Sequence, residues 1–247
     1  MSKKAFNAKK IKQDIILWIK KYFEDNGSGC NAIIGISGGK DSSVVAALCV
    51  EALGKDRVIG VKLPCNRQAD IDYANKLVDF LDISSFEINI GNIYETICKT
   101  IETSIGENIS PAAGVSLKPR LRMCMLYAVA QTFNGRVANT GNKSENVVGY
   151  YTRFGDGAGD FAPIANLTVS QVVELGRECG LPSELIEKTP IDGLSDKTDE
   201  EVLGFLYSEL DGFLMNGTSG KESVDAAISS KIEQNSWKQH GIFEYKM

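Results

Sequence analysis

The chain has 247 residues, of which 43% are hydrophobic and 24% charged, and its formal net charge is -5. This composition is ordinary for a globular protein, and the length leaves room for one large α/β domain or two small ones. The acidic balance does not favour a general nucleic-acid surface, and no apolar run approaches the roughly 18 residues of a membrane helix, so we expect neither partner.

The six cysteines are scattered and form no Cys-x-x-Cys pair, which is typical of free thiols in a reducing compartment. The first residues, Met-Ser-Lys-Lys-Ala-Phe, are not followed by the apolar core of a signal peptide. We therefore expect a cytoplasmic protein. A single histidine, His240, argues against a zinc site.

The first part of the chain predicts a helix, a buried strand and a tight turn. Apolar residues at helical spacing favour an amphipathic helix over about residues 8–24, and the Ile-rich run 33–36 is typical of a central parallel strand. The turn over residues 37–42 reads Ser-Gly-Gly-Lys-Asp-Ser and leads into a second helix that ends before Gly54. Because its glycines allow close approach to a ligand and a helix N-terminus attracts anions, we predict a phosphate-binding turn.

The spacing of this turn matches neither a Walker A loop nor the Gly-x-Gly-x-x-Gly dinucleotide fingerprint. Ser-Gly-Gly-x-Asp-Ser instead resembles the PP-loop of the ATP pyrophosphatases, which implies an ATP whose pyrophosphate lies in the loop while its α-phosphate is attacked. A carboxylate beside phosphates requires a cation, so we assign Asp41 to Mg²⁺. The alternative is an ordinary strand–turn–helix junction with Asp41 in the first helical turn.

Strands and helices alternate from there to residue 140. We predict strands over residues 57–63, 86–90 and 136–140, and helices over residues 69–81, 93–105 and 119–133. This order predicts an α/β fold with a doubly wound, mainly parallel sheet flanked by helices, like that of the PP-loop ATP pyrophosphatases and adenine nucleotide alpha hydrolases. Arg67 follows one of these strands, where it either touches the nucleotide or stays in solvent.

Residues 108–118 predict a flexible connection before a helix that starts at Pro119. Arg120 and Arg122 would then lie in the first helical turn, where cations oppose the helix dipole. That placement favours an anionic partner, although both side chains could instead pair with nearby acids.

The stretch after residue 140 is rich in glycine and poor in aliphatic side chains, which is typical of a loop built around a ligand. Ser144 is predicted to cap a short helix within it. Its motifs are Thr-Gly-Asn-x-Ser-Glu at 140–145, Gly-Tyr-Tyr-Thr at 149–152, Gly-Asp-Gly at 155–157, Asp160, and Ala-Pro-Ile at 162–164. Together with the PP-loop and Arg120, they resemble the ammonia-dependent NAD synthetases over roughly residues 10–210.

In that family, the nicotinate carboxylate of deamido-NAD attacks the α-phosphorus of ATP. Pyrophosphate departs, and an adenylated intermediate is formed. Ammonia then displaces AMP and forms the amide. The resemblance therefore implies deamido-NAD, ATP and ammonia as substrates, Mg²⁺ as cofactor, and a homodimer. The apolar faces of the helices around residues 123–133 and 203–214 are candidate interfaces.

The resemblance implies one NAD synthetase domain over residues 1–247, without a glutaminase domain. After a helix over residues 168–179 with Thr168 as N-cap, it implies a mobile lid over about residues 188–197. A helix over residues 200–214 and a C-terminal helix and tail over about 221–247 complete the chain.

The resemblance also assigns roles to single residues. The predicted ATP-binding residues are Gly35, Ile36, Ser37, Gly38, Gly39, Lys40, Asp41, Ser42 and Thr140. The predicted deamido-NAD-binding residues are Arg120, Arg153, Asp160 and Lys238, and the predicted Mg²⁺ ligands are Asp41 and Glu145. Asp41 and Asp160 would be the catalytic carboxylates, with Asp160 either binding ammonium or accepting a proton. Glu145 could instead be an acid on a surface helix.

Several positions depart from the family pattern. Val169 replaces a lysine that contacts ATP phosphate, Ile191 replaces a hydroxyl residue, and Trp237 replaces the histidine of a His-Lys pair. Arg153 replaces another lysine, which keeps the charge but changes its geometry. The lysines that could take over the lost contact are Lys143, Lys188 and Lys197.

These departures keep two other functions open. The chain could be a diverged PP-loop amide synthetase that acts on a different carboxylic acid, or a nucleotide-binding sensor without turnover. A tRNA-thiolating PP-loop enzyme fits less well, because neither a basic RNA-binding region nor a pattern of reactive cysteines is evident.

Overall fold

The computed structural model describes residues 6–67, 71–187 and 198–245. Within them, one parallel sheet has the strand order β3-β2-β1-β4. Its strands are β1 (Asn31–Gly35), β2 (Val58–Lys62), β3 (Ser84–Glu87) and β4 (Gly135–Val137). The chain adds β2 and β3 on one side of β1 and β4 on the other side, which confirms the doubly wound sheet that the sequence predicts.

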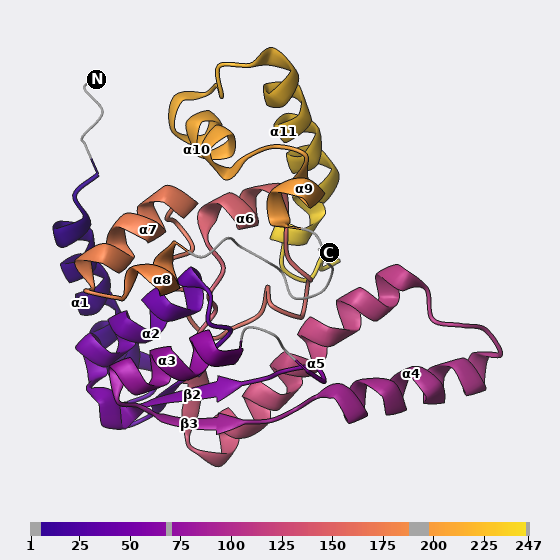
Figure 1. The fold of residues 1–247 in the computed structure, drawn as a ribbon, viewed down its shortest axis with the longest axis horizontal. Helices are drawn as coiled ribbons and strands as arrows, with labels where there is room; N and C mark the ends of the chain where they lie inside the picture. The colour runs from indigo at the N-terminus through magenta and orange to yellow at the C-terminus, as the bar shows by residue number, and fades with distance from the viewer. Residues whose placement is uncertain (1–5, 68–70, 188–197, 246–247) are drawn as a thin grey trace.

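Helices cover both faces of this sheet (Figure 1). Side chains alternate along β1, so Ala32 and Ile34 lie in one core and Ile33 lies in the other. The first core is closed by α1 (Ala8–Asn26), α2 (Lys40–Leu53), α3 (Ile71–Leu81), α7 (Val169–Glu178) and α8 (Ser183–Ile186). The second core is closed by α4 (Gly91–Ile105) and α5 (Pro111–Thr132).

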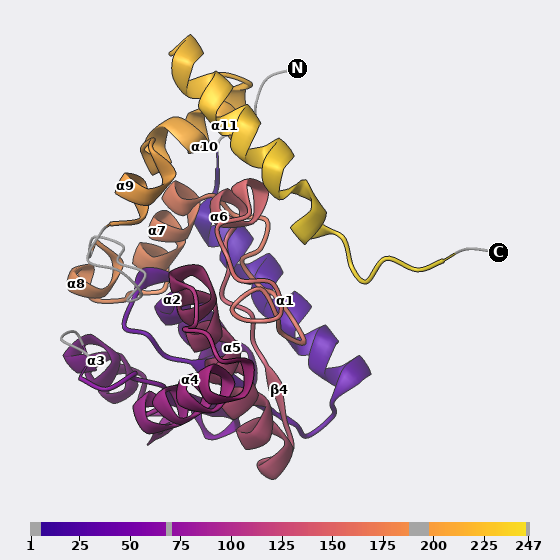
Figure 2. The ribbon, with the colours of Figure 1, turned by 90° about the vertical axis from the view of Figure 1, so that its right-hand side faces the viewer.

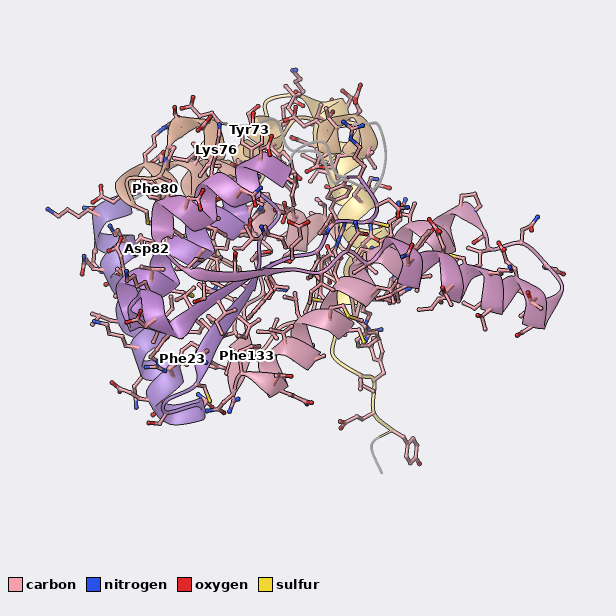
Figure 3. The ribbon with its side chains drawn as sticks, turned by 60° about the horizontal axis from the view of Figure 1, so that its bottom comes forward. Phe23, Tyr73, Lys76, Phe80, Asp82 and Phe133 are labelled. Carbon is pink, nitrogen blue, oxygen red and sulfur yellow. The ribbon has the colours of Figure 1, made fainter. Side chains whose placement is uncertain are left out.

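An exposed ion pair joins two helices of the first core. Tyr73, Lys76 and Phe80 mark the length of α3 in Figure 3. Lys76 Nζ lies 2.7 Å from Glu184 Oε2 on α8 and 5.4 Å from the centroid of the Tyr73 ring. Surface pairs of this kind contribute little stability, so buried apolar contacts hold the helices together.

A third, smaller core lies among α6 (Lys143–Val148), α9 (Asp199–Leu203), α10 (Tyr207–Asn216) and α11 (Glu222–Asn235). Its fully buried side chains include Leu210 and Ile228. After α11, a 3₁₀ turn at Ser236–Gln239 leads into an extended C-terminal tail that leaves the body of the molecule (Figure 2). The Gln239 side chain donates to the carbonyls of Asn146 and Val147, so the 3₁₀ turn lies against α6.

α4 and the adjoining start of α5 project from the body as a two-helix arm, residues 91–118 (Figure 1). The arm exposes apolar side chains at its far end, among them Ile101, Ile105 and Val115. None of the helices that the structure describes is both long and apolar enough to cross a membrane.

One predicted element is wrong in a way that affects the site. Residues 108–118 are not a flexible connection, because α5 begins at Pro111 and Pro119 lies inside it. Arg120 and Arg122 therefore lie in the middle of the helix, beyond the first turn in which the dipole acts. In the middle of a helix these two arginines do not oppose the dipole, so their position does not favour an anionic partner. Pro111 serves as the first helical residue that Pro119 was expected to be.

Other boundaries differ less. β3 begins at Ser84 instead of residue 86, and β4 ends at Val137 instead of residue 140. The helix predicted over residues 200–214 is divided into α9 and α10 at Gly204, which adopts a φ of +84° that favours glycine. The predicted lid, residues 188–197, lies outside the described residues.

Candidate active site

The turn between β1 and α2 has the geometry of an anion cradle. Gly38 adopts a φ of +78°, and a Cβ there would come within 2.8 Å of backbone and Cβ atoms of α3. Only glycine fits, because backbone cannot move aside as the tip of a side chain can. The hydroxyl groups of Ser42 and Ser43 donate to the Gly39 carbonyl at 3.1 and 2.8 Å and hold the turn.

The predicted ATP-binding residues lie together at one edge of the sheet. Gly35 ends β1, the turn follows, and α2 begins at Lys40, so the N-terminus of a 14-residue helix faces the turn. Thr140 comes shortly after β4, the strand that pairs with β1. The carboxyl ends of parallel strands are where open α/β sheets bind ligands, so this arrangement suits a phosphate group.

Asn142 joins the PP-loop to Glu145. Its fully buried side chain donates from Nδ2 to Asp41 Oδ1 at 3.1 Å and accepts the Glu145 N–H at Oδ1, also at 3.1 Å. The Glu145 carboxylate accepts the Asn142 N–H at 3.3 Å, which completes a capping box at the start of α6. One amide thus positions the two predicted Mg²⁺ ligands, which come from distant parts of the chain.

Sequence reasoning missed this role of Asn142 and assigned the cap of α6 to Ser144. The structure gives the cap to Asn142, while the Ser144 hydroxyl donates to Asp211 Oδ1 at 2.6 Å. The sequence did contain a signal for this cap, since Asn-x-x-Glu at residues 142–145 is a capping-box pattern.

The charges around Glu145 favour a cation. Burial and the nearby Asp41 carboxylate raise the pKa of Glu145 well above the ordinary range of a carboxyl group. A divalent cation would relieve this repulsion, and two carboxylates are what Mg²⁺ commonly takes from a protein before water and phosphate fill its shell. Among the described residues, no group of three or more His, Cys, Asp or Glu side chains forms a metal site by itself.

Asp160 is bound to the end of β4. Its Oδ2 accepts the Val137 N–H at 2.7 Å, and its Oδ1 accepts the Tyr127 hydroxyl at 3.4 Å. Its carbonyl accepts the Tyr22 hydroxyl at 3.0 Å. Burial, followed by the Asp160 charge, raises the pKa of Tyr127, so this hydroxyl remains a donor. The carboxylate is therefore positioned through two elements, and its part in proton transfer stays a prediction.

A cavity of about 750 Å³ lies between the loop that follows α6 and the segment that follows α11. Three of the four predicted deamido-NAD residues line it, namely Arg153, Asp160 and Lys238. The fourth, Arg120, is connected to them, because its Nε donates to the Arg153 carbonyl at 3.4 Å. The structure thus brings three of the residues to one cavity and places Arg120 next to the backbone of Arg153.

Arg153 and Trp237, two of the departures from the family pattern, lie against one another. The Arg153 guanidinium lies 4.8 Å from the ring centroid of Phe154 and 5.5 Å from that of Trp237. Its Nη2 donates to the carbonyls of His240 and Gly241 at 3.1 and 2.6 Å. A planar guanidinium can stack and donate at once, which an ammonium cannot do in the same way. We call this arrangement of Arg153, Phe154 and Trp237 the tail clamp.

Lys238 holds the tail at a second point. Its Nζ donates to the carbonyls of Gly149 and Tyr151 at 2.7 and 3.1 Å and lies 5.5 Å from the centroid of the Tyr151 ring. Burial is the main cause of the lowered pKa of Lys238. The 3₁₀ turn is therefore fastened to the loop after α6, and it forms one wall of the cavity.

Val169 supplies no charge to the site. Its side chain packs against the third core, and its N–H donates to Ser144 Oγ at 3.1 Å. Of the lysines that could replace the missing contact, Lys143 lines the cavity. Lys188, Lys197 and Ile191 lie outside the described residues.

A second cavity of about 560 Å³ lies next to the carboxyl ends of β2 and β3. Arg67 lines it together with Asn66 and Asn89. The Asn66 N–H donates to Asn89 Oδ1 at 3.0 Å, which fixes the loop that carries Arg67. Arg67 thus borders an open space at the ligand-binding edge of the sheet, as its nucleotide-binding alternative requires.

The doubly wound parallel sheet, with a Ser-Gly-Gly-x-Asp-Ser turn at the carboxyl end of β1, defines a protein of the PP-loop ATP pyrophosphatase class. Comparison with known proteins makes this specific. Residues 11–245 match NAD synthase, and the chain belongs to that family.

Individual relatives agree with this assignment. The chain is 36% identical to the NH(3)-dependent NAD(+) synthetase of Carboxydothermus hydrogenoformans over 86% of its own length and 88% of the relative's. It is 31% identical to NMN synthetase from Francisella tularensis, with a TM-score of 0.90 over 98% of this chain and 100% of that one. It is 27% identical to NH3-dependent NAD synthetase from Campylobacter jejuni, with a TM-score of 0.79 over the same shares.

We predict that Asn142→Ala costs about 1 kcal/mol of unfolding free energy through the lost cap, and that it lowers ATP-dependent pyrophosphate release at least about tenfold. Asn142→Asp should restore the cap but not the activity, because it places a third charge beside Asp41 and Glu145. Urea unfolding and a pyrophosphate assay measure the two effects.

Asn7→Ala is the matched control, since Asn7 caps α1 in the same way through the Lys10 N–H at 2.9 Å. It should lose similar stability and keep full activity. Equal loss of activity in the Asn7 and Asn142 variants would contradict the assigned role.

The chain has two tryptophans, so Trp18→Phe leaves Trp237 as the sole indole reporter of the tail clamp. In that background we predict that Arg153→Ala increases quenching of Trp237 fluorescence by acrylamide, because the stacked guanidinium no longer covers the ring. Arg177→Ala, which removes only a surface pair with Glu187, should leave quenching unchanged. An unchanged quenching constant after Arg153→Ala would show that the clamp does not persist in solution.

Proposed function

We propose that the protein catalyses the ATP-dependent amidation of deamido-NAD with ammonia, giving NAD, AMP and pyrophosphate through an adenylated intermediate. The observation that carries this proposal is the Asn142 link, which joins a phosphate-binding turn to a second carboxylate at one end of the site. The family assignment and the relatives named NH(3)-dependent NAD(+) synthetases support free ammonia as the nitrogen donor.

The first step would join the two substrates. An oxygen of the nicotinate carboxylate attacks the α-phosphorus of ATP, and the bond to pyrophosphate breaks. The N–H groups at the start of α2 and in the turn at residues 37–39 would bind the departing phosphates, with Thr140 beside them. The protein contributes mainly position and electrostatic stabilisation in this step, because the reacting groups are all anionic.

The second step would release AMP. The nitrogen lone pair of ammonia attacks the activated carbonyl carbon, the bond to the AMP oxygen breaks, and a proton leaves the nitrogen. Asp160 would bind ammonium or take this proton, and its fixed place at the end of β4 suits either role. Arg120, Arg153 and Lys238 would hold deamido-NAD around the cavity of about 750 Å³.

Asp41 and Glu145 would hold the Mg²⁺ that the family uses. When bound, such an ion would screen the phosphate charges that both steps bring together. The chain's own part is the arrangement of its two carboxylates around Asn142.

We further propose that the protein acts in the cytoplasm as one domain over residues 1–247, and that it forms a homodimer. The helix faces around residues 123–133 and 203–214 bury Leu126 and Leu210 in the second and third cores but also expose Phe133 and Leu206, so they stay candidate interfaces. The arm offers further exposed apolar side chains, with Ile105 59% exposed. A second copy that covers the arm would remove this surface from water.

If the arm forms the dimer interface, a charge placed on its apolar surface should weaken the dimer. Ile105→Lys should shift the protein toward monomer in sedimentation velocity experiments, whereas Leu17→Lys on α1, at a side chain that is 63% exposed, should not. A dimer that both variants leave intact would place the interface elsewhere, and a wild-type monomer would contradict the proposal.

A second candidate substrate is nicotinate mononucleotide, which carries the same carboxylate without the adenylate half of deamido-NAD. The observation that favours it is the TM-score of 0.90 to NMN synthetase, against 0.79 to the Campylobacter NAD synthetase. The chemistry and the predicted residues would stay the same, and only the extent of the substrate beyond the reacting ring would differ.

We predict that pyrophosphate release from ATP and Mg²⁺ requires deamido-NAD, and that ammonium converts the adenylate to NAD. Asp41→Asn should lower this rate about a hundredfold or more, since a predicted metal ligand is lost. Asp82→Asn, on the far surface and 79% exposed, is the control and should have no effect.

The same assay with nicotinate mononucleotide separates the two candidates through the ratio of kcat/KM values. A higher value for deamido-NAD supports the first proposal, and a higher value for the mononucleotide supports the second. Pyrophosphate release that responds to neither acid would contradict both.

A further inference from the structure

Lys40 is the variable residue of the Ser-Gly-Gly-x-Asp-Ser turn, and its side chain points into the protein. It is 6% exposed, and its Nζ donates to Asp41 Oδ2 at 2.9 Å. The same Nζ lies 5.7 Å from the centroid of the Tyr207 ring. A buried ammonium is tolerated only where carboxylates or an aromatic face replace its water, and here both are present.

Three carboxylates act on this ammonium: Asp41, Glu145 on α6 and Asp199 on α9. We call these three the acidic cluster. A lysine is ordinarily cationic at neutral pH, and the ion pair of the Lys40 Nζ with Asp41 Oδ2 at 2.9 Å favours this charged form. Burial lowers the pKa of Lys40 and the three carboxylates raise it, with a net rise. The structure therefore places one fixed positive charge among three acidic groups.

Asp199, which sequence reasoning did not assign to the site, is held in place by two tyrosines. Its Oδ1 accepts the Tyr150 hydroxyl and its Oδ2 accepts the Tyr207 hydroxyl, both at 3.3 Å. The carboxylate is buried, with 6% of the residue exposed. Since Tyr207 also faces Lys40, one ring connects the cation to the third carboxylate.

We propose that Lys40 is a built-in counter-cation of the acidic cluster and weakens the binding of a divalent ion to the nucleotide-free protein. Its ammonium occupies Asp41 Oδ2, an oxygen of a predicted Mg²⁺ ligand, and places positive charge beside the position of the metal. The cluster is thereby neutralised in part without metal. This proposal rests on the proposed function only in taking Mg²⁺ as the natural ion.

The phosphates of ATP would then decide when the ion binds. They bring negative charge to the turn, which offsets the charge of Lys40 and adds oxygen ligands. Divalent ion and nucleotide should therefore bind with positive coupling, and Lys40 should be the residue that creates most of it.

Mn²⁺ titration followed by electron paramagnetic resonance tests this directly, because free and bound Mn²⁺ give different signals. It is performed without nucleotide, deamido-NAD or ammonium, so its result does not depend on whether the chain makes NAD. Lys40→Met removes the charge at similar size, and we expect it to bind Mn²⁺ about tenfold more tightly than wild type. Lys40→Arg keeps the charge and should bind like wild type.

Lys12→Met is the matched control, because Lys12 is also largely buried and pairs with a carboxylate, Glu51, at 2.6 Å. It should leave Mn²⁺ affinity unchanged. Equal or weaker Mn²⁺ binding by Lys40→Met would overturn the proposal. So would a loss of ATP affinity at unchanged Mn²⁺ affinity, since Lys40 would then be a phosphate ligand.

Stability provides a second readout in case the variant is poorly folded. Without the counter-cation, Lys40→Met should melt at a lower temperature than wild type in chelator, and Mn²⁺ should recover more of the loss than in Lys12→Met. Lys40→Gln, which keeps a hydrogen-bond donor but not the charge, should behave like Lys40→Met. Instability that Mn²⁺ does not relieve in either variant would contradict the counter-cation role.

Discussion

The site depends on one buried amide. Asn142 donates to Asp41 in the PP-loop and caps the helix that carries Glu145, so two carboxylates from distant segments share one position. Burial first, and then the nearby Asp41 carboxylate, raises the pKa of Glu145, so the charged form of Glu145 is disfavoured here. The capping box and the cores on either side hold the two carboxylates in place, and such a pair would attract a cation. A phosphate-binding turn without Asn142 would lack that property.

The two ends of the site are built by different means. At the phosphate end, glycine and serine shape a turn at the start of α2, and charges are balanced in a buried cluster. At the predicted nicotinate end, Asp160 accepts a hydrogen bond from β4, and Arg153 and Phe154 of the tail clamp line the cavity. The clamp also gives a reason for two departures from the family pattern, since an arginine at position 153 and a tryptophan at position 237 stabilise each other. Among the described residues, Val169 has no comparable stacking partner, and Lys143, which lines the cavity, is the lysine that could replace the lost contact.

Features whose signal lies in a few consecutive residues were predictable from the sequence. The parallel sheet follows from alternating strands and helices, and the PP-loop follows from six adjacent residues. The start of α5 was not predictable, because Pro111 and Pro119 both suit a first helical turn and only tertiary packing selects between them. The interactions of Lys40 with the acidic cluster and of Arg153 with Trp237 join segments far apart in the sequence. No local sequence pattern predicts such interactions. The division of residues 200–214 at Gly204 did have a local signal, a glycine within a helical pattern.

A substrate carboxylate that attacks ATP at the α-phosphorus must leave one of its two oxygens in AMP when ammonia displaces the adenylate. The most direct measurement uses deamido-NAD labelled with ¹⁸O in both carboxylate oxygens, and follows the label by mass spectrometry after turnover with ATP, Mg²⁺ and ammonium. If the carboxylate attacks the α-phosphorus, one labelled oxygen appears in the phosphate of AMP and the other stays in the amide of NAD. Label found in pyrophosphate, or AMP formed without label, would contradict this mechanism.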